Sequence, residues 1–304
     1  MCPACTNVWV RDLGNYRYPV EKFGECPKQY GKKDPSTFND WMQYTKVEDG
    51  PIKEDAVAVL NKTGHIIRSW GSDIFYMPHG MTVDEELTTW VTDVALHQVM
   101  KFPKGAKSPS LVLGNKLTPG RSVYSFCMPT DVMVDSDGNI YVSDGYCNSR
   151  IIMFKSNGEF LKQWGSEDRT LLYIPHSLTL MKRRSGDILC VADRENQRVI
   201  CYQGMNDGAP WAVRSFATNG KVFAIDHVRN TIYGATYDGN EKKSSGFSFD
   251  TLKWKYTGQW NYSQGIIAHG MAMDQSSSLV IANIKRTHGM SPLYKVDLEV
   301  TNHV

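Results

Sequence analysis

The sequence lacks a long apolar run, a concentrated block of one charge and a sustained helical pattern. No stretch approaches the roughly 20 apolar residues that a membrane-spanning helix needs, so we predict no intrinsic membrane anchor. The formal net charge is only +2 over 304 residues, and Lys and Arg are spread along the chain. Nucleic acid is therefore a poor candidate partner. The missing 3.6-residue periodicity favours an all-β chain.

The first residues also lack the basic and apolar regions of a signal peptide. Other features nonetheless suggest secretion. The chain has seven cysteines and two glycosylation sequons, which begin at Asn61 and Asn261. We therefore expect that a leader is missing from this sequence and that the protein is secreted. The alternative is a cytosolic protein with free buried thiols and two chance sequons.

A repeated pattern of short apolar strands organises the chain. The clearest copy runs from Asp131 to Gly165 and contains four alternating apolar runs separated by Asp-Gly or Asn-Gly turns. Such a pattern is typical of one four-stranded antiparallel sheet. Further copies begin at Met77, Ile174 and Ile267. Repeats of this length indicate a ring or array of similar units.

The spacing of the copies predicts six sheets. The repeat position moves 51 residues from His79 to Thr130, 46 from Thr130 to His176, and 93, about twice 46, from His176 to His269. A degenerate copy is therefore expected to begin near 222–226. We predict an all-β fold, a six-bladed β-propeller of four-stranded antiparallel blades.

The N-terminal part fits the repeat less well. An earlier copy can be read from 8–11 through 56–60 to 66–70, interrupted by a poorly alternating segment from Gly14 to Asp49. We therefore expect residues 1–50 to form a poorly patterned segment with a partial first blade. Residues 51–304 are expected to form the propeller domain that carries the catalytic site.

Three histidines fall at one repeat position in alternate copies, namely His79, His176 and His269. Alternate blades of a six-membered ring are about 120° apart, and innermost strands line the central channel. The three imidazoles should therefore converge on the axis. Three histidines with an open fourth position are typical of a catalytic zinc site. The alternative is three separate, hydrogen-bonded core histidines.

Several segments share a more specific pattern: Tyr76–Gly80, Trp90–Val99, Phe126–Val132, Tyr141–Ile151, Pro175–Leu178 and Cys190–Asn196. Together they resemble the peptidyl-α-hydroxyglycine α-amidating lyases, most strongly over residues 54–205. The repeat itself is the widespread NHL type and says little about chemistry. The stretches 95–98 and 144–150 are far more specific.

The resemblance implies a zinc-dependent carbon–nitrogen lyase, a peptidylamidoglycolate lyase. Such an enzyme cleaves the N–Cα bond of peptides ending in α-hydroxyglycine and releases a peptide amide and glyoxylate. This is the step that amidates peptide hormones and neuropeptides. The resemblance also implies a monomer in the secretory-granule lumen or outside the cell, functionally coupled to a copper monooxygenase. In the family the three histidines hold zinc.

The resemblance further implies roles for three residues. Tyr146 matches an active-site tyrosine, Arg194 matches an arginine of the site, and Arg11 is the candidate for a first-blade arginine. A phenol, with an ordinary pKa of about 10, acts as a base only when a cation lowers its pKa. Arginine also suits the substrate carboxylate. The alternatives are a packed channel tyrosine and a turn arginine paired with Glu195 or Asp193.

The family also has a structural calcium. Its ligands include a backbone carbonyl that matches Met81 and a carboxylate at the position of Gly270, which has none. A hard cation needs oxygen ligands, so calcium binding is in doubt. Ile267 stands where the family has methionine. These departures suggest a divergent or less active member.

The cysteines suggest two disulfides. Cys190 and Cys201 flank a turn at positions that oppose each other on a hairpin, so we expect a cross-strand disulfide. The resemblance implies a second bridge between Cys127 and Cys147, which would fix Tyr146. The remaining residues, Cys2, Cys5 and Cys26, have no assigned role.

Two other functions fit a propeller. A metal-dependent lactonase-type hydrolase would favour calcium and carboxylate ligands rather than histidines. A non-catalytic NHL scaffold would bind protein through its blade loops, and its histidines need not meet.

Overall fold

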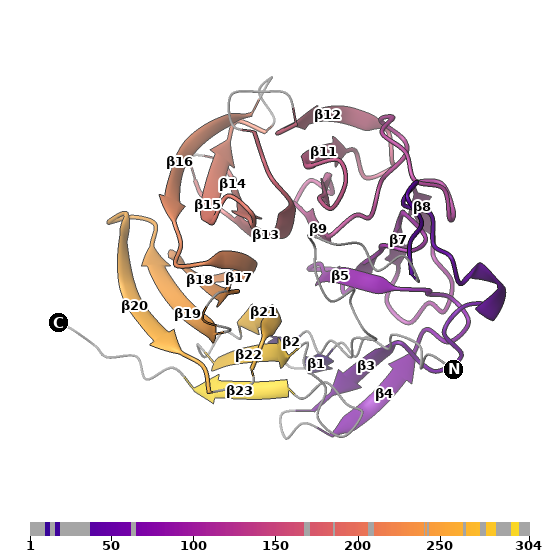
Figure 1. The fold of residues 1–304 in the computed structure, drawn as a ribbon, viewed down its shortest axis with the longest axis horizontal. Helices are drawn as coiled ribbons and strands as arrows, with labels where there is room; N and C mark the ends of the chain where they lie inside the picture. Colours follow the sequence, from indigo (N-terminus) through magenta and orange to yellow (C-terminus); the bar gives the residue numbers. More distant parts are fainter. Residues whose placement is uncertain are drawn as a thin grey trace.

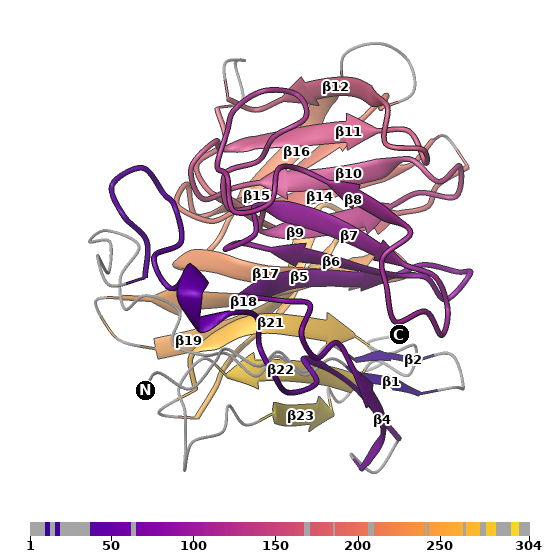
Figure 2. The same cartoon turned by 90° about the vertical axis from the view of Figure 1, so that its right-hand side faces the viewer.

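In the computed structural model, the described residues are 10–12, 16–18, 37–61, 65–166, 171–184, 186–205, 210–239, 241, 243–263, 266–273, 278–283 and 293–297. They form antiparallel β-sheets that stand around a central axis as a β-propeller (Figure 1). Figure 2 shows the strands of the sheets from the side. The all-β prediction and the propeller architecture are confirmed.

Four sheets have four strands each, in simple up-and-down order. The first contains β5 (Pro78–Val83), β6 (Thr89–Asp93), β7 (Gln98–Phe102) and β8 (Leu111–Leu113). The second contains β9 (Asp131–Val134), β10 (Ile140–Asp144), β11 (Arg150–Phe154) and β12 (Phe160–Trp164). The third contains β13 (Pro175–Met181), β14 (Ile188–Asp193), β15 (Arg198–Gln203) and β16 (Trp211–Ala217). The fourth, predicted as the degenerate copy, contains β17 (Lys221–Val228), β18 (Thr231–Asp238), β19 (Lys243–Asp250) and β20 (Lys255–Asn261).

The remaining sheets are smaller. One contains β21 (Ala268–Met273), β22 (Ser278–Asn283) and β23 (Leu293–Asp297). Another contains β3 (Val57–Leu60) and β4 (Ile66–Trp70), and a hairpin contains β1 (Val10–Asp12) and β2 (Tyr16–Tyr18). Within the described residues, four blades are complete rather than the six predicted. These smaller sheets lie side by side, with β1 against β3 and β2 against β21. Residues 19–36, 284–292 and 298–304 lie outside the described part.

Apolar side chains fill the space between neighbouring sheets. Every residue of β10 is buried because a sheet packs on each of its faces. Tyr141 and Met153 of one blade, for example, pack with Leu178 and Val191 of the next. The first strand of each complete blade lies nearest the axis (Figure 1). The inner strands therefore rest on a packed support.

Two disulfides join described residues. Cys190–Cys201 links directly paired positions of β14 and β15, as the hairpin pattern suggested. Cys127–Cys147 links the connection before β9 to the turn after β10, as the resemblance implied. Cys2, Cys5 and Cys26 lie outside the described residues, and the division of the chain at residue 50 stays a prediction.

Helices contribute little to the described part. It contains one short 3₁₀ turn, η1 (Val47–Asp49). No helix found there has the length and apolar character needed to span a bilayer.

Candidate metal centre

The three histidines of the repeat meet at the axis. Each is the second residue of an innermost strand, His79 in β5, His176 in β13 and His269 in β21. Their side chains are buried, with 3–4% of each residue exposed. One nitrogen from each ring lies within 4.8 Å of the other two, and the ring centroids are 4.7 to 5.2 Å apart.

Irregularities in the strand pairing direct these side chains. In β13, Pro175 pairs with Asp193 and Ser177 with Ala192, so His176 is an extra residue without a cross-strand pair. Such a bulge locally re-aims a side chain. The register shifts at the corresponding place in β5, β21 and β17, which hold His79, His269 and Phe223. Convergence therefore depends on repeated bulges at one blade position.

The neighbouring blade orients two of the rings. The Nδ1 atom of His79 lies 2.7 Å from the carbonyl oxygen of Thr130, and that of His176 lies 2.6 Å from the carbonyl oxygen of Phe223. Each carbonyl belongs to the residue at the same repeat position one blade further on. A carbonyl only accepts, so Nδ1 carries the proton in both rings. The Nε2 atom of each neutral ring is therefore left as a lone-pair donor.

The imidazoles are neutral at ordinary pH. Burial lowers the pKa of His79 to about 4. Burial and the neighbouring imidazoles lower the pKa of His176 and His269 well below the usual value, and the positive charge of Arg194 acts in the same direction. A neutral imidazole is the form that binds a metal ion.

Tyr146 completes the cluster. Its hydroxyl oxygen lies 2.8 Å from Nε2 of His79 and 3.0 Å from Nε2 of His176. The hydroxyl has one proton and cannot donate it to both nitrogens at once. Two nitrogen lone pairs are thus directed at one place, beside a third imidazole. This donor set fits a cation such as zinc, which takes three histidines and one further ligand at catalytic sites.

Buried aspartates support the loops that carry the cluster. Asp93 accepts hydrogen bonds from the backbone N–H groups of Tyr76 and Met77, immediately before the His79 strand. Asp193 likewise accepts from the backbone N–H of Tyr173 at 2.7 Å. Burial raises the pKa of Asp93 to about 6, although four backbone N–H groups stabilise its carboxylate. These contacts fix the segments that enter β5 and β13.

Arg194 lies next to Tyr146 and is almost fully buried, with 1% of the residue exposed. Its guanidinium carbon is 5.5 Å from the centroid of the Tyr146 ring and 5.0 Å from that of Phe223. It also forms an ion pair of 2.9 Å with Glu195, which pairs in turn with Lys221 at 2.6 Å. Arg194 therefore both pairs with Glu195 within its turn and lies against Tyr146 of the cluster.

Comparisons with known proteins identify the family of the chain. The NHL repeat family model matches residues 126–154. Peptidyl-alpha-hydroxyglycine alpha-amidating lyase 2 of Drosophila melanogaster is 36% identical over 270 residues, which cover 86% of this chain and 66% of that protein. The chain belongs to the peptidyl-α-hydroxyglycine α-amidating lyase family.

Other relatives are longer. The peptidylglycine alpha-amidating monooxygenase of Rattus norvegicus is 38% identical over 226 residues, which cover 70% of this chain and 23% of that protein. The chain thus spans between about a quarter and two thirds of the relatives described. A solved streptogramin B lyase covers 97% of this chain with a TM-score of 0.55 and 11% identity. That structure shows a shared propeller fold and no more.

Other residues that the lyase-family resemblance suggested are less well defined. Arg11 lies in β1, but its side chain is outside the described part, so its catalytic role stays a prediction. Met81 lies in β5 and pairs with Val91. Gly270, paired with Ala282, has no carboxylate to offer calcium. Gly270 therefore cannot supply the carboxylate ligand that the resemblance implied, and calcium binding stays an untested prediction.

The two sequons differ in their surroundings. Asn261 is exposed at the end of the outer strand β20, where its side-chain oxygen accepts a hydrogen bond from Ser245. Asn61 accepts a hydrogen bond from the backbone of His65. The other two sequon residues after Asn61 lie outside the described part. Glycosylation at both sites stays a prediction.

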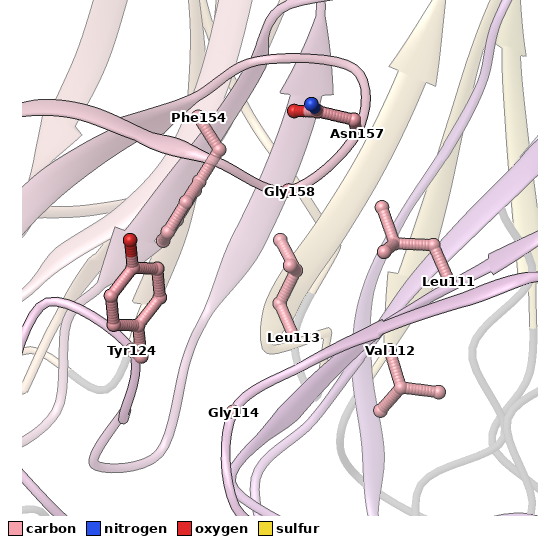
Figure 3. Close-up of a pocket in the computed structure, with 8 residues that line it drawn as sticks. All are labelled: Leu111, Val112, Leu113, Gly114, Tyr124, Phe154, Asn157 and Gly158. Atoms are coloured by element: carbon pink, nitrogen blue, oxygen red, sulfur yellow. The ribbon is translucent and has the colours of Figure 1, made fainter.

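A separate pocket of about 330 Å³ lies between two blades (Figure 3). Its walls come from β8, from the connection between β8 and β9, and from the end of β11 with the turn that follows it; Leu113, Tyr124 and Phe154 are among the lining residues. None of its lining residues belongs to the histidine cluster. The chemistry of the site therefore depends on the axis and not on this pocket.

Sequence reasoning missed two parts of the site. Phe223, which falls within the start of the degenerate copy expected near 222–226, supplies both the carbonyl that orients His176 and a ring near Arg194. In the segment 37–45, read as a loop, Met42 and Tyr44 pack against the same buried cluster as Tyr146. The repeat position could have identified Phe223, whereas the poor alternation of residues 14–49 contained no signal for the second contact.

Proposed function

We propose that this chain is a zinc-dependent lyase that cleaves the N–Cα bond of peptides ending in α-hydroxyglycine, releasing a peptide amide and glyoxylate. The convergence of three neutral imidazoles, two of them on the hydroxyl of Tyr146 beside Arg194, supports the proposal most strongly. Family membership supports the reaction type, because relatives are named for it.

His79, His176 and His269 would hold the zinc. When bound, zinc would supply Lewis acidity that stabilises negative charge on the substrate oxygen. The chain itself prepares this donor set by burying the rings in their neutral form and by orienting His79 and His176 through carbonyls of the next blade. Such hydrogen bonds to the second ring nitrogen fix the orientation of a ligand histidine and raise its basicity without contacting the ion.

The reaction needs one base and no redox partner. The substrate hydroxyl loses its proton, its oxygen becomes the aldehyde oxygen of glyoxylate, and the carbon–nitrogen bond breaks. The bonding electron pair goes to the amide nitrogen, which takes a proton. Tyr146 is the proposed base because its oxygen lies where two imidazole nitrogens converge, and Arg194 places a positive charge 5.5 Å from its ring centroid.

Arg194 is the proposed partner of the substrate carboxylate. A guanidinium binds a carboxylate through two parallel N–H donors, which fixes the orientation as well as the charge. One carboxylate oxygen of Glu195 already pairs with Arg194, but Lys221 contacts the other oxygen of Glu195. The three side chains together have one net positive charge, which attracts the substrate end. Arg11 is retained as a proposed second arginine.

We also propose that β1 to β4 together make the first blade, which brings the number of blades to six. β2 lies against the innermost strand β21, and β1 lies against β3. The order β2, β1, β3, β4 from the axis outward would close the ring. With six blades, the strands that carry the three histidines would alternate with three that do not.

The cell biology follows from the same proposal. The substrate must be made by hydroxylation of a glycine-extended peptide, the reaction class of a copper monooxygenase. Relatives named as amidating monooxygenases support a functional coupling. The two disulfides support an oxidising compartment, the secretory-granule lumen or the outside of the cell.

Glyoxylate release tests the function directly. Zinc-loaded protein is expected to release glyoxylate from α-hydroxyhippurate. An Arg194→Ala variant is expected to have a higher KM for this substrate. Metal analysis separates the alternatives, since calcium alone would favour a lactonase-type hydrolase and no metal would favour a scaffold. Failure of the zinc-loaded protein to release glyoxylate would contradict the proposal.

A further inference from the structure

Two large aromatic side chains are exposed at one end of the propeller. Trp41 is 80% exposed and Tyr173 is 57% exposed. Both lie on segments that contact the turn between β10 and β11, which carries Tyr146. Because strands alternate in direction, the turn between the second and third strands of a blade lies at the end where the first strand begins. This end of the propeller is therefore the end where the histidines stand.

A short, well-defined turn presents Trp41. Phe38 and Tyr44 form an isolated bridge, and the side-chain oxygen of Asn39 accepts hydrogen bonds from the backbone N–H groups of Trp41 and Gln43. The turn is thus closed by its own backbone and held at its tip. In Figure 2 the indigo segment that contains it projects from one end of the propeller.

The same turn is anchored against the site. Phe38 belongs to a buried cluster with Met77 and Met128, against which Met42, Tyr44, Tyr146 and Cys147 pack. The ring of Tyr44 also lies edge-on to that of Tyr76, with centroids 6.0 Å apart. Trp41 therefore stands on a support that shares contacts with the proposed base.

Tyr173 stands between the two turns that carry the proposed catalytic residues. Its backbone N–H donates to Asp193, and its carbonyl accepts from the backbone N–H of Glu195. The next residue, Ile174, donates its N–H to the hydroxyl of Ser149, 3.4 Å away. The backbone of Tyr173 is thus fixed between turn 144–150 and turn 193–198, while its ring stays exposed.

Exposed aromatic rings on fixed backbones are typical of recognition surfaces, because they offer apolar area with little loss of side-chain freedom. The substrate end must enter the cluster, so the residues before it pass over this end of the propeller. We propose that Trp41 and Tyr173 bind apolar side chains of the peptide substrate on the N-terminal side of α-hydroxyglycine. This subsite rests on the proposed function, which supplies the peptide and its direction.

Binding of an unreactive peptide tests the subsite without chemistry. The probes are fluorescent peptides with a C-terminal glycine, preceded in one by phenylalanine and in the other by aspartate. Anisotropy is measured for wild type, Trp41→Ala and Tyr173→Ala. Each variant is expected to bind the phenylalanine peptide about 3- to 10-fold more weakly, the usual effect of one aromatic contact. Binding of the aspartate peptide should change less than twofold.

Matched controls come from the opposite end of the propeller. Trp211 is the first residue of β16, the fourth strand of its blade, and is 52% exposed. Leu252 lies in the turn before β20 and is 65% exposed. Their alanine variants should bind both peptides as the wild type does. Unchanged phenylalanine-peptide binding in both Trp41→Ala and Tyr173→Ala would overturn the subsite, as would equal losses in the controls or no binding to wild type.

A second substrate separates this proposal from the function on which it rests. N-acetyl-α-hydroxyglycine has no preceding side chain, so Trp41→Ala and Tyr173→Ala should release glyoxylate from it within about twofold of wild type. If wild type releases none, the lyase function fails, and the anisotropy comparison still decides whether the two aromatic residues bind the peptide.

Discussion

The two disulfides offer a matched pair of perturbations, since only one of them adjoins the proposed base. Cys127–Cys147 places a half-cystine next to Tyr146, whereas Cys190–Cys201 crosses between two regularly paired strands. Replacing each pair with alanines should destabilise the fold by similar amounts. Only the loss of Cys127–Cys147 should impair catalysis, because the turn after β10 would lose its covalent link to the connection before β9.

The expected loss of stability follows from the loop lengths. The bridged residues are 20 and 11 positions apart. In the chain-entropy description, closing these loops stabilises the folded state by about 3.3 and about 2.8 kcal/mol. The difference of about 0.5 kcal/mol is small beside either value. Both double variants should therefore melt on the order of 5–10 °C below wild type.

Glyoxylate release at a temperature well below both melting points is the assay. Displacing a catalytic group by about 1 Å can cost on the order of 100-fold in rate. We expect kcat to fall about 10- to 100-fold in Cys127→Ala/Cys147→Ala and less than about threefold in Cys190→Ala/Cys201→Ala. Equal losses in the two variants would refute the positioning role, and so would full activity in the first.

Three further predictions concern the base, the zinc ligands and the sequon. Tyr146→Phe keeps the ring but removes the hydroxyl, so kcat should fall about 100-fold or more with zinc still bound; retention of a tenth of wild-type kcat would exclude Tyr146 as the base. Burial lowers the pKa of His79 to about 4, so protons should not compete with zinc for this ring above about pH 5. The zinc affinity should therefore stay nearly constant from about pH 7.5 to 5.5. A steep loss of affinity already below about pH 6.5, where an ordinary histidine titrates, would contradict this. Protein from a secretory host should carry a glycan on the exposed Asn261, seen as a mobility shift removed by Asn261→Gln; identical mobility would count against glycosylation.

Much of the fold could be predicted from the spacing of its repeat. The interval from His176 to His269 is twice a blade, which predicted a blade beginning at β17 although its sequence resembles the other copies poorly. The first blade could not be predicted in the same way. Its strands are separated by residues without alternation, and one of them, β2, lies against the distant strand β21.

The candidate site was predictable in its residues but not in its geometry. A repeat position shows that His79, His176 and His269 are equivalent, but not that a bulge turns each toward the axis. The contact of His79 with the carbonyl of Thr130 joins residues 51 positions apart. A backbone group has no side-chain identity in the sequence, so such a partner becomes visible only in three dimensions.

Zinc content measured on purified variants tests the central claim most directly. Wild type should hold one zinc per chain, and the three variants His79→Ala, His176→Ala and His269→Ala should each lose it. The matched control is His227→Ala, because His227 lies on the inner strand β17 but contacts Thr179 instead of the cluster. The account predicts full zinc in that control, whereas stoichiometric zinc in His176→Ala, or none in wild type, would contradict it.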